Sequence, residues 1–235
     1  MQPAIELVIF DLAGTTVADK GSIAEAFAHA MLAHGVVVPL QAIEPLMGYK
    51  KPEAIAIMLN RFAPADLAIT DKLIEDIHTR FEQNMIAFYQ DAANVKPLPY
   101  AEEVFAMLNK AGIKVAADTG FSSRIAQVIL DQLGWLDNGL MQAAIASNQV
   151  PAGRPHPFMI QSLMQKLGVH NPKAVVKVGD TEVDVNEGRN AGCLYSIAVT
   201  TGAFSRAEIA PYQPDYILDS LSELLPILGL PGLEN

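Results

Sequence analysis

Short apolar runs rich in β-branched residues recur along the chain, and most of them end at or next to Gly, Asp or Thr. Such runs predict buried strands. The six predicted strands are Glu6–Asp11, Ile113–Asp118, Ala143–Ala146, Ala174–Gly179, Leu194–Thr200 and Tyr216–Leu218. Segments with helical spacing lie between most of them, at Tyr100–Lys110, Ser122–Leu133, Pro157–Leu167, Val183–Ala191 and Leu221–Leu228. This alternation predicts an α/β fold with a parallel sheet and right-handed crossovers.

The segment between the first two predicted strands has helical patterns and no convincing strand. A capping box at Ser22–Glu25 predicts the start of a helix that ends near Gly35. Pro52 favours the start of a second helix. Apolar residues spaced by four predict a long third helix over about Asp66–Tyr89. We therefore predict a Rossmann-like core, formed by residues 1–16 and 96–235, and an inserted all-helical cap over residues 17–95.

Composition restricts the partners and the location of the protein. The 235 residues are 51% hydrophobic and 18% charged, which predicts a large buried core and no disorder. A net charge of −10 without a basic stripe argues against nucleic acid as a partner. No apolar run is long enough to cross a bilayer, and no signal-peptide pattern opens the chain. Cys193 is the only cysteine, so we expect a cytoplasmic protein without an internal disulfide.

The first candidate for chemistry is the aspartate that ends the first predicted strand, in Phe10-Asp11-Leu12-Ala13-Gly14-Thr15. Open α/β sheets bind ligands at the carboxyl ends of their strands. A carboxylate at this position can attack phosphorus and form an aspartyl-phosphate. The alternative is an ordinary turn aspartate.

A second aspartate, Asp180, follows the fourth predicted strand. If the two strands are close, Asp11, Asp180 and the backbone carbonyl of Ala13 form a hard-oxygen site suited to Mg²⁺. Asp184, one helical turn later, is a further metal ligand or holds a metal-bound water. Its alternative role is that of a helix-start aspartate, which the helix dipole favours.

Two further segments suit the binding of a phosphate group. Thr119 and Gly120 close the second predicted strand and precede a helix, where a hydroxyl and backbone N–H groups can bind phosphate oxygens. Arg154 lies in the loop Val150–Pro155, which prolines and a glycine restrict. Its guanidinium can pair with a phosphate or with Asp11. The alternatives are a helix-capping threonine and a solvated surface arginine.

In their order and their positions at strand ends, these four segments resemble the four motifs of the haloacid dehalogenase superfamily of phosphohydrolases. Three segments resemble one branch in particular, the phosphonoacetaldehyde hydrolases (phosphonatases): Asp11–Thr15, Val150–Pro155, and the last motif, which is matched at Gly179–Thr181 and at Glu187–Gly192. The resemblance implies a core with a cap, Mg²⁺ as cofactor and a small phosphonate or phosphate as substrate. It also implies substrate contacts from Ala13, Gly14, Thr15, Thr119, Gly120, Arg154 and Lys51.

Most members of this superfamily carry a second aspartate where Ala13 stands, which protonates the leaving group and later deprotonates water. Ala13 can do neither, but a leaving group that departs through carbon needs an electron sink instead, such as a lysine imine. Counting from Gly48, Lys51 falls on the imine-forming position of the phosphonatases. A place at the start of a helix beside Lys50, together with partial burial, predicts a lowered pKa for Lys51.

Two departures from the phosphonatase pattern leave the role of Lys51 open. Ala54 stands where phosphonatases have a histidine, and neither Gly21 nor Ser22 is the cysteine that they carry after the first motif. Lys51 is therefore an imine former, a holder of phosphate or carboxylate, or a bystander.

The sequence thus predicts a Mg²⁺-dependent hydrolase that works through an aspartyl-phosphate, with phosphonoacetaldehyde as the leading substrate. The alternatives are a phosphate-monoester phosphatase, similar to phosphoglycolate phosphatases, and a non-catalytic phosphonate-binding protein. Phosphonatases pair through their caps, and the apolar helix Ile23–Leu32 would permit a homodimer.

Overall fold

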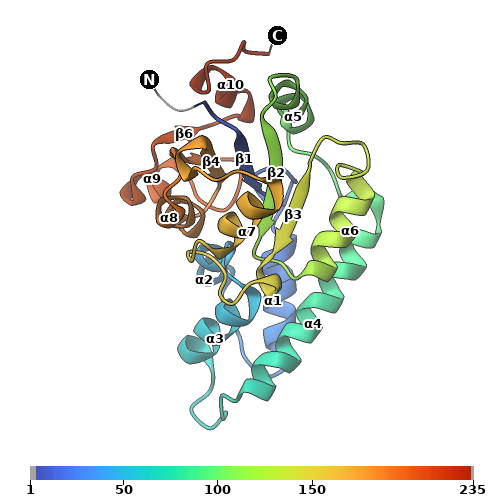
Figure 1. The fold of residues 1–235 in the computed structure, drawn as a ribbon. Helices are drawn as coiled ribbons and strands as arrows, with labels where there is room; N and C mark the ends of the chain where they lie inside the picture. Colours follow the sequence, from blue (N-terminus) through green and yellow to red (C-terminus); the bar gives the residue numbers. More distant parts are fainter. Residues whose placement is uncertain (1–3, 234–235) are drawn as a thin grey trace.

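The computed structural model describes residues 4–233, and its centre is a six-stranded parallel sheet in the order β3-β2-β1-β4-β5-β6 (Figure 1). The strands are β1 (Leu7–Asp11), β2 (Lys114–Thr119), β3 (Ala143–Ala146), β4 (Val175–Gly179), β5 (Tyr195–Val199) and β6 (Tyr216–Leu218). All six predicted strands are confirmed, with ends that differ by one residue at most. The chain runs outward from β1 to β3 and then returns to β4 on the other side of β1. Asp11 and Asp180 therefore flank the switch point, where such sheets bind ligands.

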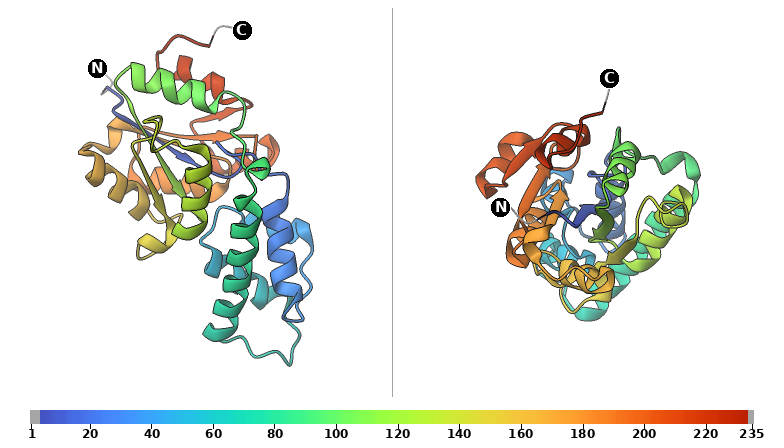
Figure 2. Two further views of the ribbon diagram at one scale, coloured as in Figure 1. Left: turned by 90° about the vertical axis from the view of Figure 1, so that its right-hand side faces the viewer. Right: turned by 45° about the horizontal axis from the view of Figure 1, so that its top comes forward.

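Helices cover both faces of the sheet, which gives the expected three layers (Figure 2). Val8 and Phe10 share a core with α5 (Ala101–Lys110), α6 (Ser123–Leu133) and α10 (Leu224–Ile227). Leu7 and Ile9, which alternate with them, share a core with α7 (Phe158–Leu167). The remaining helices of the core are α8 (Glu182–Ala191) and α9 (Arg206–Ile209). Because side chains alternate along a strand, Asp11 lies on the same face as Ile9.

The first four of the five α-helices between β1 and β2 form a unit that we call the cap: α1 (Ser22–Leu32), α2 (Leu40–Ile43), α3 (Lys51–Phe62) and α4 (Asp71–Gln90). Short 3₁₀ turns follow α2 at Glu44–Leu46 and α4 at Ala92–Asn94. Helices α1 and α4 lie side by side and extend away from the sheet, and Phe27 stacks on Phe81 between them, with ring centroids 4.2 Å apart (Figure 2). The predicted domain limits at residues 17 and 95 stay a prediction.

The apolar side of α1, which the sequence suggested as a dimer surface, packs largely inside the cap. Ile23, Phe27, Ala30 and Met31 are buried there, whereas Leu32 at the end of the helix is 58% exposed. Dimerisation through this helix stays a prediction. Among residues 4–233, no helix is long and apolar enough to cross a membrane.

Two local predictions about helix starts were wrong. Ser22 is the first residue of α1 rather than its cap, because Asp19 Oδ1 accepts hydrogen bonds from both Ser22 N (3.0 Å) and Ser22 Oγ (2.6 Å). The third helix begins at Asp71 rather than Asp66, because the hydroxyl of Thr70 caps it by accepting from the N–H of Leu73. The predicted helix Leu221–Leu228 is divided into a 3₁₀ turn, Leu221–Glu223, and α10.

Helix α8 lies unusually close to the sheet at Gly188. A Cβ at this position would lie 2.8 Å from Lys177 Cβ and would also meet Ser196 Oγ, far inside normal contact. We therefore expect Gly188→Ala to lower the free energy of unfolding by about 1–3 kcal/mol through overpacking. Urea denaturation followed by circular dichroism measures the change. Gln165→Ala on the exposed side of α7 is the control, for which we expect less than about 0.5 kcal/mol. Equal midpoints for Gly188→Ala and the wild type would contradict the prediction.

Candidate active site

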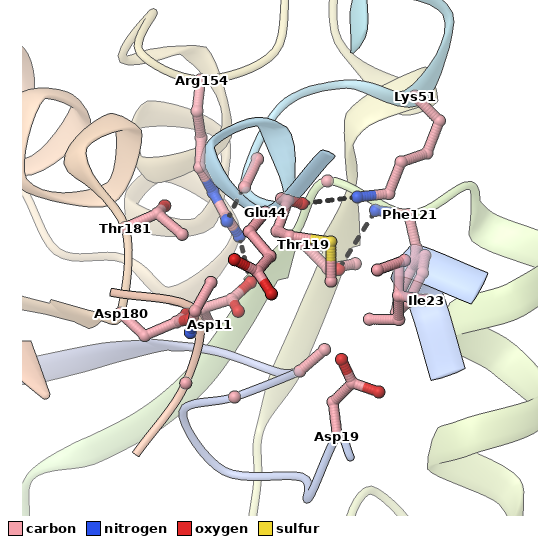
Figure 3. Close-up of a pocket in the computed structure, with 18 of the residues that line it drawn as sticks. Asp11, Asp19, Ile23, Glu44, Lys51, Thr119, Phe121, Arg154, Asp180 and Thr181 are labelled. Carbon is pink, nitrogen blue, oxygen red and sulfur yellow. Dashed lines mark hydrogen bonds and ion pairs between the residues drawn. The ribbon is translucent and has the colours of Figure 1, made fainter. Parts of the chain in front are cut away.

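Most of the residues singled out from the sequence line one cavity of about 180 Å³ between the cap and the carboxyl ends of the strands (Figure 3). These residues are Asp11, Ala13, Gly14, Lys51, Thr119, Gly120, Arg154 and Asp180. Thr15 and Asp184 do not line the cavity; both are buried behind it. The strand order therefore brings the four predicted segments together, and α3 adds Lys51 from the cap.

Asp11 ends β1 and is 5% exposed. Its Oδ1 lies 2.5 Å from Nη2 of Arg154, in a buried ion pair (Figure 3). Burial raises the pKa of Asp11 to about 6, although Arg154 opposes this shift. Of the two partners that the sequence offered for Arg154, a phosphate or Asp11, the guanidinium contacts Asp11.

Asp180 directly follows β4 and accepts two hydrogen bonds, from Thr15 Oγ1 at 3.2 Å and from Ala203 N at 2.7 Å. Gly14 is needed beside it, because a Cβ there would lie 2.7 Å from Asp180 Oδ2 and the backbone φ is +87°. Burial raises the pKa of Asp180 well above its ordinary value, and the nearby Asp11 adds to the effect. Thr15, expected as a substrate contact, thus orients the carboxylate of Asp180.

Asp184 stands at the start of α8, where Thr181 fixes its carboxylate. Its Oδ2 accepts from Thr181 Oγ1 at 2.5 Å and from Thr181 N at 3.3 Å. Its Oδ1 lies 3.0 Å from Nη1 of Arg154. The helix-start contact is therefore present, and the role of Asp184 as a metal ligand or as the holder of a metal-bound water stays a prediction.

Lys51 is the first residue of α3 and is only 2% exposed. Its Nζ donates to a backbone carbonyl, that of Met47, at 2.6 Å and lies 5.0 Å from the ring centroid of Phe121 (Figure 3). The ring centroid of Phe27 lies 5.6 Å from the same nitrogen. Burial lowers its pKa from 10.5 to about 8. The predicted direction of the pKa shift is confirmed, and its main cause is desolvation.

The loop that carries Lys51 rests directly on Gly120 of the core. A Cβ on Gly120 would lie 2.6 Å from the carbonyl oxygen of Tyr49 and 2.7 Å from that of Gly48. Thr119 Oγ1 accepts from the N–H of Phe121 at 3.2 Å, which shapes the turn before α6. Gly120 therefore permits the close approach of the cap that places Lys51 in the cavity.

Several residues of the site were not predicted from the sequence. Asp118 and Lys177 carry charges inside β2 and β4, and both are fully buried. A lysine within the apolar strand Val175–Gly179 is a signal that could have been read, because a buried charge must be paired. Asp19 and Glu44 also line the cavity, from the segments that flank α1 and α2. They gave no signal, because no local pattern tells which part of a cap faces the core.

The charge balance of the site suits a divalent cation. Five buried carboxylates, those of Asp11, Asp118, Asp180, Asp184 and Glu187, outnumber the three buried cations of the site, Arg154, Lys177 and Lys51. One oxygen each of Asp11, Asp118 and Asp184 lies within 4.8 Å of the others. A donor set of carboxylates suits a hard cation such as Mg²⁺. Such a cluster could bind a divalent metal. It shares Asp11 and Asp184 with the ligand set that the sequence predicted, but it contains Asp118 in place of Asp180, so the predicted set of metal ligands stays a prediction.

Comparison with known proteins places this chain in a family. Residues 5–192 match the family model of the haloacid dehalogenase-like hydrolases. A phosphonoacetaldehyde hydrolase of Bacillus cereus is 31% identical over 208 residues, which cover 85% of this chain and 77% of that protein.

Solved structures show the same fold. A phosphonoacetaldehyde hydrolase-like protein from Oleispira antarctica superimposes with a TM-score of 0.85 at 24% identity, covering 97% of this chain and 92% of that one. A predicted phosphoglycolate phosphatase from Haemophilus somnus gives a TM-score of 0.76 at 22% identity, covering 97% and 99%. The match to the family model and the 31% identity to a hydrolase argue against the non-catalytic binding protein that the sequence left open. The chain is a hydrolase that belongs to the haloacid dehalogenase-like family, on its phosphonatase-like branch.

Proposed function

We propose that the protein is a Mg²⁺-dependent hydrolase that cleaves the carbon–phosphorus bond of a small phosphonate aldehyde, with phosphonoacetaldehyde as the leading candidate. The observation that carries this proposal is a buried lysine of lowered pKa, Lys51, in the same cavity as the strand-end carboxylate Asp11. Ala13 beside them cannot protonate an oxygen leaving group, which favours a leaving group that departs through carbon. The similarity to phosphonoacetaldehyde hydrolases supports the choice of substrate.

The role of Lys51 is to provide the electron sink. Its neutral amine adds to the aldehyde carbon, and loss of water leaves an imine that takes up a proton. With a pKa of about 8, roughly a tenth of the lysine is neutral at pH 7, which is about 300-fold more than at the ordinary pKa of 10.5. The faces of Phe27 and Phe121 exclude water from this amine.

The role of Asp11 is that of the nucleophile. One of its oxygens attacks phosphorus, the carbon–phosphorus bond breaks, and the electron pair of that bond moves into the iminium group to leave an enamine. The enamine takes up a proton on carbon, and water then releases acetaldehyde and the free amine. A second water cleaves the aspartyl-phosphate into phosphate and Asp11.

Asp11, the carbonyl of Ala13 and Asp180 would hold the cation on the cavity side, with Asp184 behind them. The other face of Asp11 is taken by Arg154, which contacts both Asp11 and Asp184. When bound, the cation neutralises charge on the phosphonate oxygens. Thr119 and Gly120 line the cavity before the N-terminus of α6, a position that favours an anionic group.

Borohydride trapping tests this proposal. We expect reduction of the protein in the presence of phosphonoacetaldehyde and Mg²⁺ to leave a mass adduct on Lys51, detected by peptide mass spectrometry. Samples without substrate, and the variant Lys50→Met with substrate, are the controls; the variant should be labelled like the wild type. A folded, Mg²⁺-loaded sample that gives no adduct on Lys51 would reject the imine.

A phosphate-monoester phosphatase is the second candidate, favoured by the carboxylates of Asp19 and Glu44 in the cavity lining. A carboxyl group from the cap can transfer protons in place of the missing aspartate at position 13. Turnover of small sugar phosphates or phosphoglycolate at rates above that of phosphonoacetaldehyde would support this candidate.

A further inference from the structure

Two carboxylates lie side by side in the sheet at the site of the nucleophile. Strands β1 and β2 are parallel and paired so that Asp11 stands directly beside Asp118. Both side chains are buried, and like charges in adjacent register positions repel each other. A cation between them is therefore required if both are ionised.

Arg154 supplies that cation, and both the carboxylate and the backbone carbonyl of Asp118 bind its guanidinium. Nη2 of Arg154 lies 2.6 Å from the carboxylate Oδ1 of Asp118 and 2.8 Å from its backbone carbonyl. The same nitrogen lies 2.5 Å from Oδ1 of Asp11. Arg154 comes from a loop, whereas Asp118 belongs to a central strand, so the strand gives the guanidinium a rigid support.

Lys177 on β4 holds Asp118 in turn. Its side chain is fully buried, and its Nζ contacts Oδ1 of Asp118 and lies 3.1 Å from Oδ1 of Asp184 and 3.3 Å from Oε2 of Glu187. A lysine is tolerated in a strand interior only with such partners, because an isolated buried ammonium is strongly disfavoured. Gly188 leaves the room that the stem of this lysine occupies.

We propose that Asp118 is a positioning residue which, anchored by Lys177, holds the guanidinium of Arg154 against Oδ1 of Asp11. The contact with Oδ1 prevents rotation of the Asp11 carboxylate and so sets the direction from which Asp11 meets phosphorus. Asp118 itself does not line the cavity and acts through Arg154. The inference rests on the proposed function in that it takes Asp11 as the nucleophile.

A crystal structure of Asp118→Asn tests the inference without any substrate. The amide keeps the shape of the side chain and removes its charge. We expect Nη2 of Arg154 to move away from Oδ1 of Asp11, from 2.5 Å to beyond about 3.5 Å, the limit of a hydrogen bond. The double variant Asp118→Asn/Lys177→Met, which leaves no unpaired ammonium, should show the same movement. An Arg154–Asp11 contact that persists in both variants would overturn the inference.

Kinetics provide the second readout. For Asp118→Asn we expect kcat to fall about 10- to 100-fold and KM to change less than about threefold, because substrate contacts are kept. In an Arg154→Ala background the same substitution should change kcat less than about threefold, since its effect passes through the arginine. Equal effects in both backgrounds would show that Asp118 acts independently and would overturn the inference. Asp131→Asn on the exposed side of α6 is the matched control.

The crystal structures and the kinetics together distinguish a failure of this inference from a failure of the proposed function. Failure of the wild type to turn over phosphonates would reject the proposed function, whereas the position of Arg154 in the crystal structures would still decide whether Asp118 holds it.

Discussion

Replacing Lys51 with methionine should lower turnover of phosphonoacetaldehyde by at least about 10³-fold and, at the same time, make the protein more stable. The loss follows because Lys51 is the one lysine among the described residues that line the cavity. The gain follows because a fully buried ammonium, held by one carbonyl and two aromatic faces, is replaced by an apolar side chain that packs well on aromatic rings.

The stability gain should depend on pH in a defined window. Below pH 8, Lys51 is protonated in both the folded and the unfolded chain, so the folded protein bears the full penalty of burying the charge. Between pH 8 and 10.5 the folded state loses this proton before the unfolded state does, so wild-type stability rises with pH. The advantage of Lys51→Met should therefore be about 1–3 kcal/mol at pH 7 and shrink as pH rises above 8.

Urea denaturation at pH values from 6.5 to 9.5, together with steady-state kinetics, checks both halves of this prediction. The matched control is Lys50→Met, which changes the neighbouring, partly exposed lysine and should leave kcat within about threefold of the wild type. Wild-type kcat/KM should rise with pH up to about 8, as the amine becomes neutral. A Lys51→Met protein that retains a tenth of the activity would show that Lys51 only holds the substrate.

Replacing Asp11 with asparagine should lower turnover by about 10⁴-fold or more, whatever the substrate is, because the amide cannot form an acyl phosphate. The fold should survive, since the change is isosteric and removes a carboxylate from a site where carboxylates outnumber cations. This prediction holds for a phosphonatase and for a phosphatase alike. It therefore tests the nucleophile separately from the role of Lys51.

Trapping with beryllium fluoride and Mg²⁺ provides a readout for Asp11 that needs no turnover. We expect the wild type and the surface control Asp137→Asn to bind one beryllium fluoride, measured by native mass spectrometry, and Asp11→Asn to bind none. Intact mass must exclude deamidation of the asparagine, which would restore the aspartate. Binding of beryllium fluoride by pure Asp11→Asn would place the nucleophile elsewhere.

Local sequence patterns were sufficient to predict the strands of the sheet and the candidate site residues at their carboxyl ends. The β-branched runs gave all six strands, because a strand buried on both faces needs little more than apolar residues and a stop signal. The parallel order then placed Asp11, Thr119 and Asp180 at the same edge. The same local reasoning failed at the starts of α1 and α4. Ser22 and Asp66 were predicted to mark these starts, but Asp19 and Thr70 accept the hydrogen bonds from the first turns.

Tertiary structure decided everything that depends on which side chains meet. No local pattern shows that Arg154 contacts Asp11 and Asp118 together, because that contact arises from strand register and from the path of a distant loop. The burial of Lys51 between Phe27 and Phe121 likewise requires the cap to close on Gly120. The sequence by itself therefore determined which chemical groups reach the edge of the sheet. Only packing decided how they are paired and charged, because ionisation depends on burial and on neighbours that are remote in the chain.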